Sequence, residues 1–210
     1  MPARKVDVAA FRIDRYPVTN AQFLAFLVAN PQWRKSNIKA IFADGHYLDR
    51  WPTDLVWAKS QSPNQPVTSV SWFAAQAYCE SEGSALPTTD QWEYALWDEG
   101  RHQNEVKAAQ LAWFGTPGSA FPEIDSLAPN GLGIHGLVGA VWELTLDVEG
   151  VPTGSDARSG SDTKLFCGGA SVGAKDPSDY AAFMRYSFRS CIKASYTTKD
   201  LGFRCAGREP

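Results

Sequence analysis

Apolar residues recur along the chain with two periods, one typical of short strands and the other of helices. Residues 11–14 alternate apolar and polar side chains and predict a first β-strand. Thr19 and Gln22 have the spacing of a helix capping box, and the helix that they open keeps apolar residues at helical spacing until Pro31 ends it. Ser71 and the capping box of residues 88–91 predict two further helices.

The other segments have weaker or shorter periodicity. Residues 32–64 contain three tryptophans without a regular pattern and predict a long ordered loop. Residues 165–172 and 201–205 have strand character. In residues 184–189, Met184, Tyr186 and Phe188 alternate with polar side chains, which predicts a half-buried strand. Arg185 and Arg189 would then lie on its basic outer face.

A glycine-rich stretch, residues 130–139, precedes a short apolar run. Its glycines at 131, 133, 136 and 139 exclude a helix, because each would cost about 1 kcal/mol relative to alanine, and they indicate a loop with positive-φ turns. A strand is expected to follow this loop. The stretch also spells GxGxxG, but no strand precedes it and no helix follows it, so a dinucleotide-binding role is rejected.

Glu143 is the one charged residue in the apolar run 141–144. A buried carboxylate is unfavourable unless a cation or hydrogen-bond donors satisfy it. A glycine-kinked loop turns backbone carbonyls inward, and carbonyls with one carboxylate are ligands that calcium favours. Glu143 is therefore a candidate calcium ligand. The alternatives are an edge-strand glutamate that faces water and a glutamate that pairs with a nearby arginine.

Length and composition indicate a single domain over residues 1–210. The 210 residues are 44% apolar and 12% aromatic, enough for one sizeable core, and no charge block or Ser/Gly-rich linker divides them. A net charge of −3 with scattered basic residues gives no electrostatic basis for binding nucleic acid or an anionic membrane. No apolar run approaches the roughly 20 residues that cross a bilayer, so no membrane span is expected.

Four cysteines, at positions 79, 167, 191 and 205, form no CxxC pair. A zinc cluster is therefore not expected, and the cysteines are either bridged or free. Arithmetic alone allows three pairings.

Residues 130–147, NGLGIHGLVGAVWELTLD, resemble the NGxGLxxxxGNVWEW signature of the formylglycine-generating enzyme family, also called the sulfatase-modifying factor family. Other similar segments follow in the family's order, namely YPVTN at 16–20, PVTSVSW at 66–72, LPT at 86–88, WEYA at 92–95, GG at 168–169 and LGFRC at 201–205. The resemblance implies the family's fold, a loop-rich α+β variant of the C-type lectin-like fold with little regular secondary structure. Glu93 resembles a glutamate that the family keeps in this helix, with a solvated first-turn acid as the alternative.

The resemblance also implies a disulfide. The family commonly bridges the cysteines of the motifs AYC and GFRC, which are Cys79 and Cys205 here. If this bridge forms, an oxidising compartment is expected, so the protein would be extracytoplasmic, either periplasmic or secreted. Otherwise it would be cytoplasmic.

The expected calcium site combines Glu143 with the carbonyls near Val138 and Gly139. Ala140 stands where the family usually has asparagine, so one side chain that helps to shape the site is missing. A weak or empty site is one consequence of this replacement.

Copper is the cofactor of the family's characterised enzymes, which oxidise a sulfatase cysteine to formylglycine with molecular oxygen. Two thiolates five residues apart hold the copper, a few residues after the GG motif. The corresponding positions here, 173–176 and 179–182, contain no cysteine. Cys167 and Cys191 are the remaining thiols, 24 residues apart. We interpret them first as a second disulfide, with two buried small side chains as an alternative and a displaced copper pair last, so no copper is expected.

These departures favour a binding function over catalysis. The chain is expected to be a non-catalytic accessory or binding protein with a protein partner, such as a companion of a metalloenzyme, and to lack formylglycine-generating activity. The alternative is a copper-dependent oxidase that uses Cys167 and Cys191. The family's iron-dependent sulfoxide synthases use several histidines from an added helical domain, whereas this chain has only His46, His102 and His135.

Overall fold

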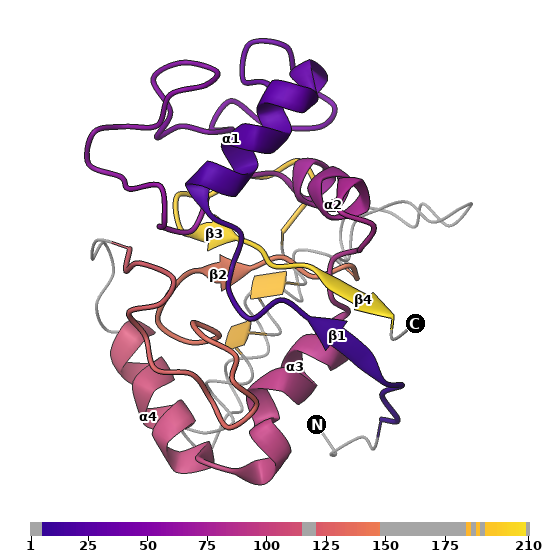
Figure 1. Ribbon diagram of the computed structural model, residues 1–210, viewed down its shortest axis with the longest axis vertical. Coiled ribbons are helices and arrows are strands. Elements are labelled where there is room, and N and C mark those ends of the chain that lie inside the picture. The colour runs from indigo at the N-terminus through magenta and orange to yellow at the C-terminus, as the bar shows by residue number, and fades with distance from the viewer. Residues whose placement is uncertain (1–5, 115–120, 148–183, 186–187, 190–191, 209–210) are drawn as a thin grey trace, which may run out of the picture.

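Short helices and two pairs of very short strands, joined by long loops, make up the fold (Figure 1). The computed structural model describes residues 6–114, 121–147, 184–185, 188–189 and 192–208. The elements in the described part are β1 (Phe11–Ile13), α1 (Asn20–Ala29), the 3-10 helix η1 (Pro31–Trp33), α2 (Trp72–Ser81), α3 (Thr89–Trp97), the 3-10 helix η2 (Asp98–Gly100), α4 (Gln103–Phe114), β2 (Trp142–Glu143), β3 (Leu201–Gly202) and β4 (Ala206–Arg208).

Side-chain caps fix where the first three α-helices begin. Thr19 caps α1 and Thr88 caps α3, and in both helices the third-position glutamine completes a capping box. Ser71 accepts the Ala74 N–H at the start of α2, and Gly83, with φ of +69°, follows the C-terminal cap of that helix. The helix starts predicted from the sequence are therefore confirmed.

The two strand pairs lie in the middle of the molecule. β1 pairs antiparallel with β4, and β2 pairs parallel with β3. Because β3 and β4 follow each other directly, the C-terminal segment contributes to both pairs. In Figure 1, α1 and α2 lie above the strands and α3 and α4 lie below them. Residues between β3 and β4 are thus placed at the centre of the protein.

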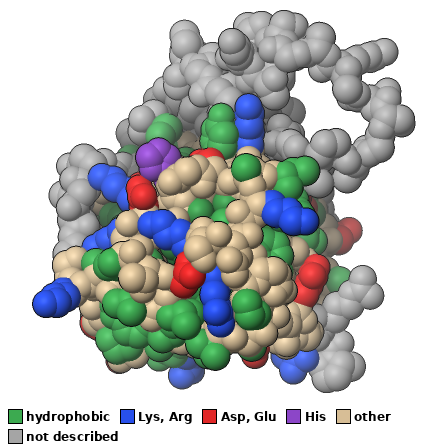
Figure 2. Space-filling model, turned by 90° about the horizontal axis from the view of Figure 1, so that it is seen from above, with side chains coloured by type: hydrophobic (Ala, Val, Ile, Leu, Met, Phe, Trp, Pro, Cys, Tyr) green, Lys and Arg blue, Asp and Glu red, His purple; other side chains and the backbone are tan. Residues whose placement is uncertain are grey.

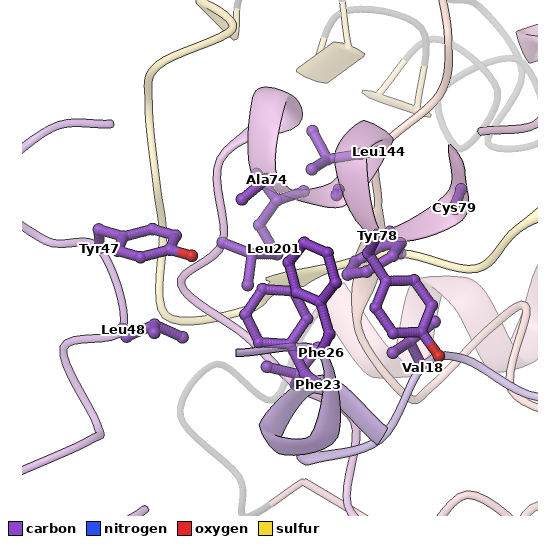
Figure 3. Close-up of a cluster of buried hydrophobic side chains, with 14 of the residues drawn as sticks. Val18, Phe23, Phe26, Tyr47, Leu48, Ala74, Tyr78, Cys79, Leu144 and Leu201 are labelled. Atoms are coloured by element: carbon purple, nitrogen blue, oxygen red, sulfur yellow. The ribbon is translucent and has the colours of Figure 1, made fainter. Parts of the chain in front are cut away.

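The main hydrophobic core lies between α1, α2 and the C-terminal segment. The rings of Phe23, Phe26, Tyr78 and Phe203 contact one another, with centroid separations between 5.4 and 6.1 Å. Figure 3 shows the rings of Phe23, Phe26 and Tyr78 packed together between α1 and α2. Burial of such large side chains is the main source of stability. Trp51, from the long loop that the sequence predicted, is also fully buried in this core.

Two parts of the structure differ from the sequence predictions. Residues 103–114 form α4, which the sequence pattern did not predict. The described residues of 184–189 are helical, so the predicted strand is wrong there. Arg185 and Arg189 are only 12% and 7% exposed rather than facing solvent. One carboxylate, that of Glu93, binds both side chains. The strand predicted at 165–172 lies outside the described residues.

The surface of the described part carries mixed side chains. On the face shown in Figure 2, Lys and Arg side chains lie scattered between acidic and apolar ones. Among the helices of the described part, none has both the length and the apolar character needed to cross a membrane.

Candidate functional site

A fully buried ion pair joins the motifs WE and GFRC. Glu143 of β2 faces Arg204, which follows β3, and both side chains are 0% exposed. Nη2 of Arg204 donates to Oε1 of Glu143 at 2.7 Å, and Nε donates to Oε2 at 2.8 Å. The parallel pairing of β2 with β3 brings the two residues together. This two-point contact confirms the arginine-paired alternative for Glu143.

The rest of the Arg204 guanidinium binds backbone carbonyls. Nη2 also donates to the carbonyl of His135 at 2.8 Å, and Nη1 donates to the carbonyls of Asp14 and Arg15 at 3.0 and 3.3 Å. A guanidinium has five N–H donors, so each has an acceptor. Arg204 therefore ties together the end of β1, the glycine-rich loop and β2.

Trp92 of α3 links this pair to a second charged group. Its indole N–H donates to Oε2 of Glu143 at 2.6 Å. The guanidinium of Arg189 lies over the Trp92 ring, 4.2 Å from a ring centroid, which is a cation–π geometry. One indole thus contacts a buried carboxylate through its edge and a buried cation through its face.

Glu93, the next residue of α3, holds two arginines of the 184–189 segment. Arg185 donates to both carboxylate oxygens at 2.9 and 2.8 Å, and Arg189 donates to Oε1 at 2.9 Å. Arg185 also donates to the side chain of Gln110 in α4. Burial alone would raise the pKa of Glu93, but the two arginines lower it below its usual range. Glu93 is therefore a structural anchor for this segment, not a solvated first-turn acid.

The glycine-rich loop is shaped by side-chain contacts and positive-φ turns. Oδ1 of Asn130 accepts the N–H groups of Leu132 and Ile134, and its Nδ2 donates to the carbonyl of Ala95. Positive φ angles occur, as the sequence predicted, at Gly133, Gly136 and Gly139. Gly131 packs against Asp98, and an added Cβ would lie 2.8 Å from its Oδ1. The loop therefore needs a glycine at 131 for space and at the other three positions for backbone conformation.

The calcium ligands predicted from the sequence differ in whether they are free to bind a cation. Val138 and Gly139 lie in the turn of residues 137–140, before β2. Both carboxylate oxygens of Glu143 instead accept hydrogen bonds from Arg204 and Trp92. Calcium at Glu143 would have to displace a buried guanidinium, so these residues do not fit the ion well. Calcium binding stays a prediction to be tested.

The cysteines of the described part form one disulfide, Cys79–Cys205, which joins α2 to the C-terminal segment across 126 positions. Cys167 and Cys191 lie outside the described residues, so their pairing stays a prediction. Because the described part offers no free thiol, and no group of three or more His, Cys, Asp or Glu that could hold a metal, its residues do not fit copper. No reaction step through copper follows from these residues.

Residues 1–209 match the family described as "Sulfatase-modifying factor enzyme 1-like domain". The chain belongs to this family. Its α+β fold, with a few short strands and long loops, is the one that this membership implies. The WE, WEYA and GFRC motifs of the family thus meet in the buried Trp92–Glu143–Arg204 cluster.

Relatives in this family have names that indicate different activities. The "Formylglycine-generating enzyme" of Mus musculus is 28% identical over 265 residues, which cover 98% of this chain and 68% of that protein. The "Inactive C-alpha-formylglycine-generating enzyme 2" of the same organism is 27% identical over 256 residues, covering 98% of this chain and 77% of that protein. The "Hercynine oxygenase" of Mycolicibacterium thermoresistibile is 31% identical over 184 residues, covering 69% of this chain and 37% of that protein. Likeness within the family therefore does not decide between catalysis and its absence.

Sequence reasoning found Glu143, Glu93 and the disulfide but missed the arginines that hold the two glutamates. Arg204 lies 61 positions from Glu143, and Arg185 lies 92 positions from Glu93. The one signal in the sequence was the spacing of four between Arg185 and Arg189, which allows both to reach a single carboxylate.

Proposed function

We propose that this chain is a non-catalytic accessory or binding protein built on the sulfatase-modifying factor scaffold, with a protein as its partner. The main support for the proposal is that no cysteine stands where the family's enzymes hold copper. Cys79 and Cys205 are joined in a disulfide, and Cys167 and Cys191 are 24 residues apart in sequence. The positions that correspond to the family's thiolate pair contain no cysteine. The described residues therefore offer no pair of soft thiolate ligands that could hold Cu(I).

The motifs that remain are those that build the scaffold. Glu143, Arg204 and Trp92 form the central cluster, and each side chain is buried. These side chains form hydrogen bonds with one another, and Arg204 also binds backbone carbonyls. They therefore stabilise the fold without offering a reactive group. A chain that keeps this framework and lacks the thiol pair is suited to presenting loops to a partner.

Location outside the cytoplasm is part of the proposal. The Cys79–Cys205 bridge closes a loop of 126 positions in the core, and such structural bridges persist in oxidising compartments. A periplasmic or secreted protein is the corresponding expectation. The test is alkylation of cells with a membrane-permeant thiol reagent before lysis, followed by peptide mapping. Two alkylated cysteines at 79 and 205 would contradict both the bridge and the location.

The alternative, a copper-dependent oxidase, makes a prediction about Cu(I). In the alternative, Cys167 and Cys191 together hold one ion, so the protein would retain Cu(I) against a chromogenic chelator such as bicinchoninate. We expect no retained copper in the wild type. Stoichiometric retention that is lost in both Cys167→Ser and Cys191→Ser would favour the alternative. Retention that both variants leave unchanged would come from other groups and would not restore the thiolate site.

The binding half of the proposal is tested with a purified partner. Affinity capture from the native source would supply candidates, and each would then be produced alone and titrated against the chain. We expect a saturable one-to-one complex with at least one candidate. If every captured protein fails to bind the purified chain, the binding proposal is contradicted.

A further inference from the structure

A polar cavity of about 360 Å³ lies beside the disulfide, with Cys205 in its lining. It is bounded by the connection from β1 to α1, by the end of α2 and by Cys205, which directly precedes β4. The lining side chains that matter here are Asp14, Val18, Tyr78, Glu82, Ser84 and Ile124. The volume falls at the lower end of the range for small-molecule sites. Val18 and Tyr78 come from the YPVTN and AYC motifs, and none of these six residues takes part in the Trp92–Glu143–Arg204 cluster through its side chain.

Tyr78 connects the hydrophobic core to this cavity. The side chain is 6% exposed, and its ring packs against Phe23, Phe26 and Phe203. Figure 3 shows its hydroxyl group directed away from the ring cluster toward Val18, which also lines the cavity. Within the described residues, this hydroxyl has no hydrogen-bond partner. The hydroxyl oxygen is not sealed in the core but is open to the cavity, so it can accept a hydrogen bond from a ligand there.

Two carboxylates face the same cavity. Asp14 uses Oδ2 to accept the N–H of Cys205 at 3.1 Å, which leaves Oδ1 available, and Glu82 lies at the C-terminal cap of α2. Burial raises the pKa of Asp14 above its usual value; the Cys205 N–H and Arg204 oppose this rise, and the charges of Glu143 and Glu82 add to it. Burial, with Glu82 and Asp14 adding to it, raises the pKa of Tyr78 to about 12. The three groups therefore interact electrostatically, and a cation bound between them would be favoured.

We propose that this cavity binds an alkylammonium group, carried by a lysine side chain or by a free diamine. An ammonium has three N–H donors, which match the carboxylates of Asp14 and Glu82 and the hydroxyl oxygen of Tyr78. Val18 and Ile124 offer apolar surface for the alkyl chain.

The geometry favours an ammonium over calcium. Calcium takes six to eight oxygen ligands, whereas the cavity is lined by only two carboxylates. Arg15 also lines the cavity, but its Nη2 lies near Gly133, 3.4 Å from where a Cβ would be built. The cavity thus keeps an acidic end for the ammonium. This inference does not depend on whether the chain has oxidase activity.

Calorimetric titration with two probes tests the proposal, the first being Nα-acetyl-lysine methylamide and the second cadaverine. Binding of at least one probe is expected, and the neutral isostere Nα-acetyl-norleucine methylamide should not bind. Asp14→Asn and Glu82→Gln should each weaken binding by about tenfold or more, since each removes a charge-assisted hydrogen bond. Tyr78→Phe should weaken it several-fold. The matched control is Glu80→Gln, because Glu80 is exposed on the same helix, does not line the cavity and uses its carboxylate to bind Gln76.

The outcomes separate the sources of the ammonium group. Binding of the lysine derivative alone supports a lysine side chain of a protein, and binding of cadaverine alone supports a free diamine; both support the site. Circular dichroism melting verifies that each variant is folded, and Tyr78→Phe keeps the ring packing if Asp14→Asn does not fold. The proposal is overturned if neither probe binds, if Glu80→Gln weakens binding as much as Glu82→Gln, or if calcium binds in the cavity in place of the ammonium.

Discussion

Replacing Glu143 by glutamine should destabilise the protein strongly, because it leaves Arg204 as a buried cation without a counter-charge. Both side chains are 0% exposed in the structure. Removing one partner of a buried pair costs about 3–5 kcal/mol. The carbonyls of Asp14, Arg15 and His135 still accept from the guanidinium, so we expect the lower end, about 3 kcal/mol. For a chain of this size that corresponds to a melting temperature lower by about 6–12 °C.

Urea unfolding followed by tryptophan fluorescence measures this change in the free energy of unfolding. The matched control is Glu105→Gln, an exposed glutamate on α4, which should change stability by less than about 0.5 kcal/mol. The double variant Glu143→Leu/Arg204→Met should recover much of the loss, because it removes both buried charges together.

Repeating the unfolding measurement with and without calcium distinguishes Glu143 as the partner of Arg204 from Glu143 as a calcium ligand. If Arg204 is its partner, the loss in Glu143→Gln is the same in excess calcium and in chelator. A loss below about 1 kcal/mol would refute the buried-pair reasoning. A loss seen only with calcium present would instead make Glu143 a calcium ligand, because a bound ion stabilises only the protein that holds it.

Three further predictions concern other contacts. Cys79→Ala/Cys205→Ala should lower the free energy of unfolding in urea by about 4–5 kcal/mol, because the bridge closes a loop of 126 positions; a loss under about 1 kcal/mol would contradict this. Glu93→Gln should destabilise the protein at neutral pH, because Arg185 and Arg189 lower the pKa of Glu93 in the folded state. The stability that Glu93 contributes is complete above its unfolded pKa of about 4.3 and is lost as pH falls through the folded pKa. The difference from wild type in urea unfolding should therefore vanish in acid. Gly131→Ala should cost about 1–3 kcal/mol, because its Cβ would meet a carboxylate, whereas Gly45→Ala, with open space around it, should be nearly neutral in thermal melting.

Helix starts could be predicted from the sequence because their physical cause is local. Thr19 and Gln22 lie three residues apart and bind each other's backbone, and Thr88 does the same with its own glutamine. Such bonds depend on neighbouring residues alone, so the pattern that encodes them is complete within one short segment. The same holds for the positive-φ glycines of the loop.

Residues 184–189 could not be predicted in this way. Alternation of apolar and polar residues over six positions fits a strand, but the described residues are helical, with Phe188 half-buried and both arginines bound to one carboxylate. Phe188 stacks on Trp142 at 4.3 Å, and Arg185 and Arg189 bind Glu93. These partners lie far away in the sequence, so tertiary contacts decided the conformation.

The partner of Glu143 could not be predicted from the sequence either. The sequence showed a carboxylate in an apolar run and therefore a need for a counter-charge, but calcium and arginine both met that need. Arg204 could be chosen only once β2 and β3 were known to pair side by side. The missing thiol pair, by contrast, was evident from the sequence, because it depends on residue type and position alone.

The central claim is that this chain does not generate formylglycine, and turnover of a peptide tests it most directly. The protein, mildly reduced and supplied with Cu(I) and oxygen, is incubated with a peptide that carries the sulfatase cysteine motif, and mass spectrometry follows the loss of the cysteine sulfur. A characterised formylglycine-generating enzyme serves as the positive control. We predict no conversion above the rate without protein. Conversion by the wild type that both Cys167→Ser and Cys191→Ser abolish would contradict the account and make the chain an oxidase.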